Sequence, residues 1–176
     1  MSDVRAKHIQ AKILDVPDFP KPGILFRDIT PLLGDGKTFG MVTALFVEKF
    51  QDEKIDKIVS IEARGFIFGA ALAQALGVGF VPVRKPGKLP GKSRAITYAL
   101  EYGTDTLEIH EDSIRQGERV LIVDDVLATG GTATAARDLA QFCGAEIVGC
   151  AFLIELSFLP GRKKLSPSSV YSIITY

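Results

Sequence analysis

The chain has few cysteines. Only Cys143 and Cys150 occur among its 176 residues, too few for a disulfide framework or for a zinc site built from thiolates. Cys143 also continues an apolar helical stripe with Ala136, Leu139 and Ala140. Because unpaired cysteine is among the most buried residue types, we expect both cysteines to be core residues. A reducing cytoplasm fits this usage.

The chain also lacks excess charge and long apolar runs. Its formal net charge is zero, so no bulk field would recruit nucleic acid or an anionic membrane. No apolar run approaches the ~20 residues that a membrane helix needs. The first segment, MSDVRAKHIQAKI, has neither the apolar core nor the small-residue cleavage site of a secretion signal. We therefore expect a cytoplasmic protein without nucleic-acid or membrane partners.

What the sequence does contain is typical of one globular domain. Apolar residues make up 47% and charged residues 24% of the chain, ordinary values for a single domain over residues 1–176. Periodicity predicts helices over residues 37–50, 64–76 and 130–143, and strands over residues 57–61, 79–83, 120–123 and 147–154. The second helix is apolar nearly all round, so we expect it to be buried. The alternation indicates an α/β fold with a mostly parallel central sheet flanked by helices.

The N-terminal part is less regular. Ser2 and Asp3 can cap a short first helix that ends near Ile13. Three prolines then exclude regular structure from Pro17 through Gly23, because proline lacks an N–H and restricts the residue before it.

Between the predicted strands the pattern changes once more. Residues 95–100 and 106–110 read as two antiparallel strands, with Gly103 and Asp105 flanking the turn. The polar stretch RKPGKLPGKSR precedes them. Loops this long inside a compact domain are usually functional or disordered.

The segment VLIVDDVLATGGT, residues 120–132, has the order of a ligand-binding turn. Four apolar residues place Asp124 and Asp125 at the carboxyl end of a buried strand, where open α/β sheets bind ligands. The two glycines let the backbone approach a ligand, and successive N–H groups at the next helix form a cradle for an anion. Two threonine hydroxyls can add donors. The predicted phosphate cradle comprises Ala128, Thr129, Gly130, Gly131 and Thr132.

The paired acids add a second requirement. Adjacent carboxylates would repel a phosphate unless they accept hydrogen bonds from hydroxyl groups. A ribose 2′,3′-diol carried by the same phosphate supplies those donors, so Asp124 and Asp125 favour ribose 5-phosphate over bare phosphate. The competing interpretation is a capped helix with two incidental acids, which a Gly-Gly turn alone would favour.

VDDVLATGGT resembles the phosphoribosyl pyrophosphate (PRPP) signature of the type I phosphoribosyltransferases. Within that family the chain is similar to the members that act on adenine, in runs over residues 18–33, 61–69, 83–91 and 98–110. The resemblance implies the type I phosphoribosyltransferase fold, with an N-terminal arm and base-binding hood over residues 1–34. It also implies a long, flexible, two-stranded catalytic loop within residues 84–112.

The resemblance further implies an activity. We expect a glycosyltransferase of purine salvage that converts adenine and PRPP into AMP and pyrophosphate, with Mg²⁺, as a cytoplasmic homodimer. One alternative is a related transferase for hypoxanthine, guanine or xanthine. Another is a PRPP-sensing regulator that has the same fold but has lost catalysis. Such a protein should lack a glutamate at the position of Glu101 and carry a DNA-binding extension.

Two segments would hold the pyrophosphate. In IEARG, the arginine resembles the pyrophosphate-loop arginine of the family, and the two residues before it would offer backbone N–H groups. The family often has serine where Ala63 stands. The basic loop, which begins with Arg84, Lys85 and Lys88, would close over the site and exclude water. The basic residues near its base would reach pyrophosphate, partly across the dimer. On charge alone the segment would be interpreted as a solvated loop. The implied pyrophosphate contacts are Glu62, Ala63, Arg64, Arg84, Lys85 and Lys88.

Catalysis and base binding are also assigned by the resemblance. The implied catalytic residues are Glu101, Arg64 and Tyr102. Glu101 would handle the proton on the N7/N9 side of adenine, and Tyr102 would help to order the closed loop. Without the resemblance Glu101 would read as a surface residue.

The base would lie against Phe26, which otherwise would be a core residue. The implied adenine contacts are Ile24, Phe26, Arg27 and Val126. Mg²⁺ would arrive with PRPP, since it favours substrate phosphates over a cage of protein ligands. His8 and His110 lack metal-ligand spacing, so we expect surface residues.

Overall fold

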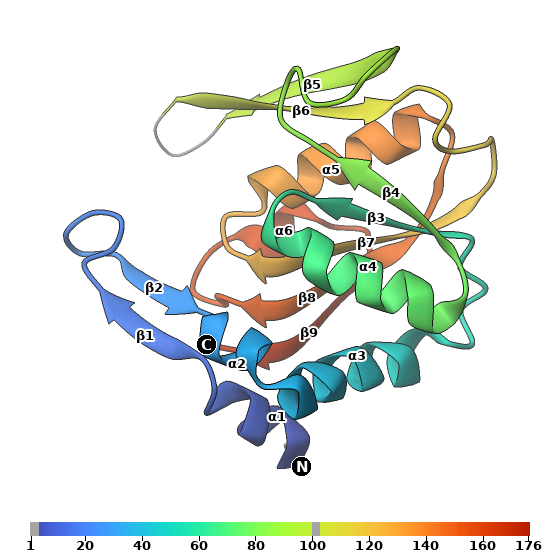
Figure 1. The fold of residues 1–176 in the computed structure, drawn as a ribbon. Helices are drawn as coiled ribbons and strands as arrows, with labels where there is room; N and C mark the ends of the chain where they lie inside the picture. Colours follow the sequence, from blue (N-terminus) through green and yellow to red (C-terminus); the bar gives the residue numbers. More distant parts are fainter. Residues whose placement is uncertain (1–3, 100–102) are drawn as a thin grey trace. The chain divides into compact units, whose positions relative to one another are not determined.

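The computed structural model describes residues 4–99 and 103–176, which fall into two compact units (Figure 1). The N-terminal unit is Met1–Leu45 and the C-terminal unit is Phe46–Tyr176. Every helix among the described residues is too short or too polar to span a bilayer.

The N-terminal unit contains a two-stranded antiparallel ribbon between short helices. Its elements are α1 (Val4–Gln10), β1 (Leu14–Pro17), β2 (Leu25–Asp28), α2 (Thr30–Gly34) and the first part of α3 (Gly36–Phe50). Pro17 lies opposite Leu25 in the ribbon, so the prediction that regular structure is absent from Pro17 onward is wrong at this residue. Proline is tolerated on an edge strand, where one side needs no N–H for the ladder.

A five-stranded parallel sheet forms the centre of the C-terminal unit, in the order β4-β3-β7-β8-β9. Its strands are β3 (Lys57–Ile61), β4 (Gly79–Val83), β7 (Arg119–Leu127), β8 (Glu146–Glu155) and β9 (Val170–Thr175). All neighbouring strands pair in parallel. Burial on both faces explains the continuous apolar runs in their sequence, and the predicted α/β fold is confirmed.

Helices α4 (Arg64–Leu76) and α5 (Gly131–Phe142) cover opposite faces of this sheet (Figure 1). Successive residues of a strand face opposite sides. Ser60 of β3 therefore meets Gly69 of α4, whereas Val59 packs in the core cluster with Leu139 of α5. The outer side of α4 is exposed, with Ile67 37% accessible, so the expectation that this helix is buried all round is wrong. Within this unit α4 packs on the sheet through one side only, so the side that faces away from the sheet is not covered.

The hairpin of β5 (Ser93–Ala99) and β6 (Thr104–His110) packs on the α5 side. Leu107 and Ile109 are fully buried in the same cluster as α5. The predicted hairpin is confirmed, and β6 begins at Thr104, two residues before the predicted start of this strand.

Several boundaries differ from the prediction. β7 continues to Leu127, so Asp124 and Asp125 lie inside the strand, because β7 still pairs with β8 at Asp124, Val126 and Leu127. The short helix α6 (Gly161–Lys164) and strand β9 have no predicted counterpart. Cys150 is buried as expected, whereas Cys143 is only half buried, at the end of α5.

Candidate active site

The loop between β7 and α5 has the geometry of an anion cradle. Gly130 is the N-cap of α5 with a φ of 80°, and no side chain of the described residues caps the helix. The first N–H groups of the helix are therefore left for another acceptor. The loop and Asp124 line a cavity of ≈ 80 Å³, against the ~30 Å³ of one water, enough for a group of a few heavy atoms. All five predicted cradle residues line it.

Asp124 and Asp125 both reach the first turn of α4. Asp125 Oδ2 lies 2.6 Å from Arg64 Nε, and Ala63 is the N-cap of the helix. A Cβ added at Gly65 would lie 2.5 Å from Asp124 Oδ1, so glycine leaves the room that this carboxylate occupies. The Asp125 N–H donates to Asp124 Oδ1 over 2.9 Å. Carboxylates are stabilised here by the positive end of the helix dipole.

Burial and mutual repulsion control the ionisation of this pair. Burial, and then the charge of Asp125, raise the pKa of Asp124 well above its usual value. Burial also raises the pKa of Asp125, although Arg64 opposes the rise. Two carboxylates this close resist ionising together. A ligand that brings hydroxyl donors or positive charge would therefore stabilise the ionised pair.

Glu62, directly after β3, gathers the start of the basic loop around its carboxylate. Oε1 accepts the Lys85 N–H over 2.5 Å, and Oε2 lies 3.3 Å from Arg84 Nη2 and 3.6 Å from Lys88 Nζ. Burial would raise the pKa of Glu62, but the bonds from Lys85 and Arg84 hold it below its usual value. The Glu62 N–H donates to the Val83 carbonyl over 3.0 Å, so this N–H is not available to pyrophosphate in this arrangement.

A polar chain connects the basic loop, the hairpin and the cradle. Lys85 Nζ forms an ion pair with Asp105. The Tyr98 hydroxyl lies 3.2 Å from Asp105 Oδ2 and 3.2 Å from Thr132 Oγ1. Sequence reasoning missed the roles of Tyr98 and Asp105. The signal was their pairing, since the two residues face each other across the hairpin.

Two of the predicted catalytic residues, Glu101 and Tyr102, lie outside the described residues.

Three of the four predicted adenine contacts belong to the N-terminal unit. Phe26 is half buried in β2, with its ring edge-on to Phe19 at 5.1 Å between centroids, so it is not a buried core residue. Arg27 forms an ion pair with Asp15. Ile24 is 45% exposed, and its N–H donates to the Lys21 carbonyl. The fourth contact, Val126, lines the cradle cavity of the C-terminal unit.

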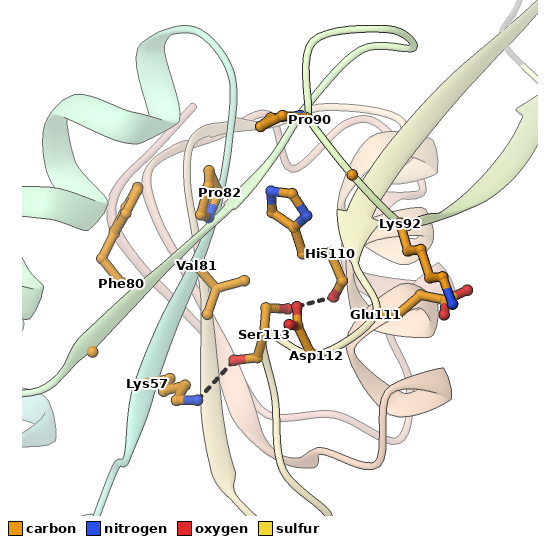
Figure 2. Close-up of a pocket in the computed structure, with 12 residues that line it drawn as sticks. Lys57, Phe80, Val81, Pro82, Pro90, Lys92, His110, Glu111, Asp112 and Ser113 are labelled. Atoms are coloured by element: carbon orange, nitrogen blue, oxygen red, sulfur yellow. Dashed lines mark hydrogen bonds between the residues drawn. The ribbon is translucent and has the colours of Figure 1, made fainter.

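A larger cavity of ≈ 700 Å³ lies between β4 and the base of the hairpin (Figure 2). Lys57 donates to the Ser113 carbonyl over 2.7 Å at its edge. Of the predicted site residues that the structure describes, none lines it. His110 does, and it is half buried there, whereas His8 is exposed.

Among the residues that the structure describes, no three His, Cys, Asp or Glu side chains gather as a metal site.

Comparison with known proteins gives concordant results. A family model described as the phosphoribosyl transferase domain matches residues 35–174. The adenine phosphoribosyltransferase of Geobacter metallireducens is 59% identical over 164 residues, 93% of this chain and 96% of the relative. The corresponding protein of Syntrophotalea carbinolica is 57% identical, again over 93% of this chain and 96% of the relative.

Solved structures are similar over comparable lengths. The adenine phosphoribosyltransferase of Thermoanaerobacter pseudethanolicus has a TM-score of 0.95 at 51% identity, covering 97% of this chain and 99% of that one. The enzyme of Saccharomyces cerevisiae, in complex with adenine and an imino-altritol bisphosphate, has a TM-score of 0.91 at 44% identity, covering 96% and 98%.

Proposed function

The chain is a transferase of the adenine phosphoribosyltransferase family, and we propose that it transfers the 5-phosphoribosyl group of PRPP to adenine, giving AMP and pyrophosphate. One observation carries the proposal: the anion cradle and the paired carboxylates Asp124 and Asp125 adjoin each other at the carboxyl end of β7. The cradle, Ala128 to Thr132, would hold the 5′-phosphate. The acids would accept hydrogen bonds from the ribose diol.

Charge separation is the main demand of this reaction. The bond from C1′ to pyrophosphate breaks, which leaves positive charge on the sugar and negative charge on the leaving group. Preorganised charges on both sides lower such a barrier. Asp124 and Asp125 would stabilise the positive charge on the sugar. The cationic side chains of Arg64, Arg84, Lys85 and Lys88 would stabilise the negative charge on pyrophosphate.

The cations near the leaving-group position are held by acids of the chain itself. Arg64 pairs with Asp125, and Arg84 and Lys88 contact Glu62. Lys85 pairs with Asp105. Pyrophosphate would compete with these carboxylates for the same donors, with the backbone N–H of Ala63 as a further contact. Before the substrate binds, the ion pairs with these carboxylates would hold the cationic side chains in the orientation that pyrophosphate needs.

The base would be held and deprotonated by the remaining predicted residues. The Phe26 ring would stack on adenine, an interaction worth about 1–3 kcal/mol, with Ile24, Arg27 and Val126 as neighbours of the base. As N9 bonds to C1′, adenine loses its N9 proton, and Glu101 would handle that proton. Tyr102 would help to order the loop that excludes water.

Mg²⁺, a homodimeric state and a cytoplasmic location complete the proposal. When bound with PRPP, Mg²⁺ would neutralise charge on the pyrophosphate oxygens. In such sites it is usually bound by one or two carboxylates together with waters and substrate phosphates. The absence of a three-ligand cluster among the described residues is compatible with that mode. Light scattering of the purified protein would test the dimer.

A panel of bases tests the proposed reaction. The protein is offered PRPP and Mg²⁺ with adenine, hypoxanthine, guanine or xanthine, and pyrophosphate release is followed. We expect turnover with adenine above all. Preference for an oxopurine would support the alternative transferase, and no turnover with any base would overturn the transferase proposal in favour of a regulator.

A further inference from the structure

The backbone of the phosphate cradle rests directly on the backbone at the start of α6. A Cβ added at Gly161 would lie 2.3 Å from the Ala128 carbonyl oxygen and 2.8 Å from Leu127 Cδ1. In the other direction, a Cβ added at Gly130 would lie 2.8 Å from Gly161 Cα. Neither side of this contact has room for a side chain, so the position of α6 limits where the cradle can lie.

The next residue, Arg162, fastens α6 to the sheet. Its Nε and Nη2 donate to the two oxygens of Glu155 over 2.7 and 2.5 Å. Its Nη1 donates to the Val170 carbonyl over 3.0 Å, and Ser172 Oγ donates to Glu155 over 2.7 Å. Glu155 is only 4% exposed. A bidentate arginine–carboxylate pair fixes orientation as well as distance.

Glu155 is the last residue of β8, next to the strand that leads into the cradle. It lies beside Leu127 in the β7–β8 register, and the Leu156 N–H donates to the Leu127 carbonyl over 2.9 Å. Arg162 holds the pKa of Glu155 below its usual range. The Glu155 carboxylate is therefore ionised and paired with Arg162.

The C-terminal end of α6 is hydrogen-bonded to α5, the helix whose first residues form part of the cradle. Arg137 of α5 donates through Nη1 to the Leu165 carbonyl over 3.1 Å, and Leu165 is fully buried. The short helix is therefore fixed at both ends, to β8 and β9 through Arg162 and to α5 through Leu165.

We propose that Gly161 and Arg162 are positioning residues for the ribose-phosphate site: Arg162 clamps α6 on Glu155, and Gly161 sets the depth of the cradle. The proposal rests on the proposed function, because it names the ligand of the cradle as the 5′-phosphate of ribose. Neither residue touches the substrate. Their effect should therefore appear in PRPP binding and not in the chemistry of the base.

Arg162→Lys is the first test, because lysine keeps the charge but loses the two-pronged geometry. We expect KM for PRPP to rise about tenfold, since a displacement of about 1 Å in a positioning group has effects of this order or larger. We expect kcat to change by less than about threefold, which separates lost binding from lost chemistry. The dissociation constant of ribose 5-phosphate, measured by calorimetry, should rise in parallel with KM for PRPP.

Gly161→Ala tests the same idea without touching a charge. The new methyl group would push the Ala128 carbonyl outward, so we expect the same loss of affinity for ribose 5-phosphate while Arg162 and Glu155 stay paired. If Arg162→Lys does not fold, this variant decides. Lys57→Gln is the matched control, because it breaks an ion pair with Glu118 of 2.8 Å at the opposite, amino end of the strands and should leave KM for PRPP unchanged.

The outcomes separate the two proposals. A wild-type protein that neither binds ribose 5-phosphate nor turns over refutes the proposed function. A wild-type protein that does both, with Arg162→Lys and Gly161→Ala variants of unchanged affinity, refutes the positioning role alone. Equal losses in the Lys57→Gln control would also refute it, because the effect would then be general destabilisation.

Discussion

Replacing Gly65 with alanine should damage substrate binding more than stability. The added Cβ would lie 2.5 Å from Asp124 Oδ1 and 3.1 Å from Ser60 Oγ. Overpacking of this kind costs about 1–3 kcal/mol, while exchanging glycine for alanine in a helix returns about 1 kcal/mol. The net loss is about 0–2 kcal/mol. For a chain of this size that lowers Tm by up to about 8 °C.

The functional loss follows from the carboxylate that must move. If Asp124 no longer meets the ribose diol, a hydrogen bond to a charged group is lost, worth about 1.5–3 kcal/mol. At about 1.4 kcal/mol for each factor of ten, kcat/KM for PRPP falls by about 10- to 100-fold. Initial rates of AMP formation with PRPP varied, together with a thermal melt, measure both quantities.

Gly69→Ala is the matched control for this prediction. It lies one turn along the same helix, and the three atoms nearest to its added Cβ belong to Ser60, at 2.5 Å, and Phe80, at 3.1 Å, whereas for Gly65 the nearest belongs to Asp124. The two variants should lose comparable stability, but only Gly65→Ala should lose affinity for PRPP. If both variants keep normal kinetics, or both lose them equally, the assignment of Asp124 to the ribose is refuted.

Three other perturbations have distinct expected outcomes. Glu101→Leu should lower kcat by about 10²-fold, the usual scale for a general acid–base group, and near-wild-type turnover would contradict its role. Tyr98→Phe removes hydroxyl contacts to Asp105 and Thr132; neutral hydrogen bonds are worth about 0.5–1.5 kcal/mol, so KM for PRPP should rise about 2- to 10-fold, and an unchanged value would argue against the link from hairpin to cradle. Arg162 lowers the pKa of Glu155, so the folded state gives up this proton more readily than the unfolded state does. The stabilisation is therefore complete above the unfolded value of about 4.3 and is lost as pH falls through the lower folded value. The difference in unfolding free energy between wild type and Arg162→Gln should accordingly be constant above about pH 5 and shrink in more acidic solution; a difference independent of pH would contradict the pairing.

The parts of the molecule that are local in sequence were the predictable ones. The strand β3 and helix α4 were predicted with the boundaries that the structure shows, because an apolar run and a helical period are each contained in a short window. The cradle was predicted for the same reason: strand, acids, glycines and helix start follow one another along the chain.

Features that depend on distant neighbours were not predictable. Asp124 and Asp125 look like the end of a strand, but pairing with β8 carries β7 on to Leu127. The role of Gly161 depends on its contact with Gly130, and nothing in the local sequence of either glycine indicates the other. Helix α6 is a single turn, too short to show a period.

The same distinction applies within the candidate site. Arg84 and Lys88 of the basic loop are conspicuous in the sequence. Their shared partner, Glu62, is revealed only by the tertiary contacts. The sequence had instead suggested that the backbone N–H of Glu62 would bind pyrophosphate. In the structure its carboxylate is the organising group, since the N–H is already bonded to Val83.

The central claim is that the segment from Val120 to Thr132 binds the ribose phosphate of PRPP. The most direct test is AMP formation from adenine over a range of PRPP concentrations, for wild type and for the double variant Asp124→Asn/Asp125→Asn. Loss of the charged hydrogen bonds to the diol should raise KM for PRPP at least about tenfold. A double variant that saturates at the wild-type PRPP concentration would contradict the claim.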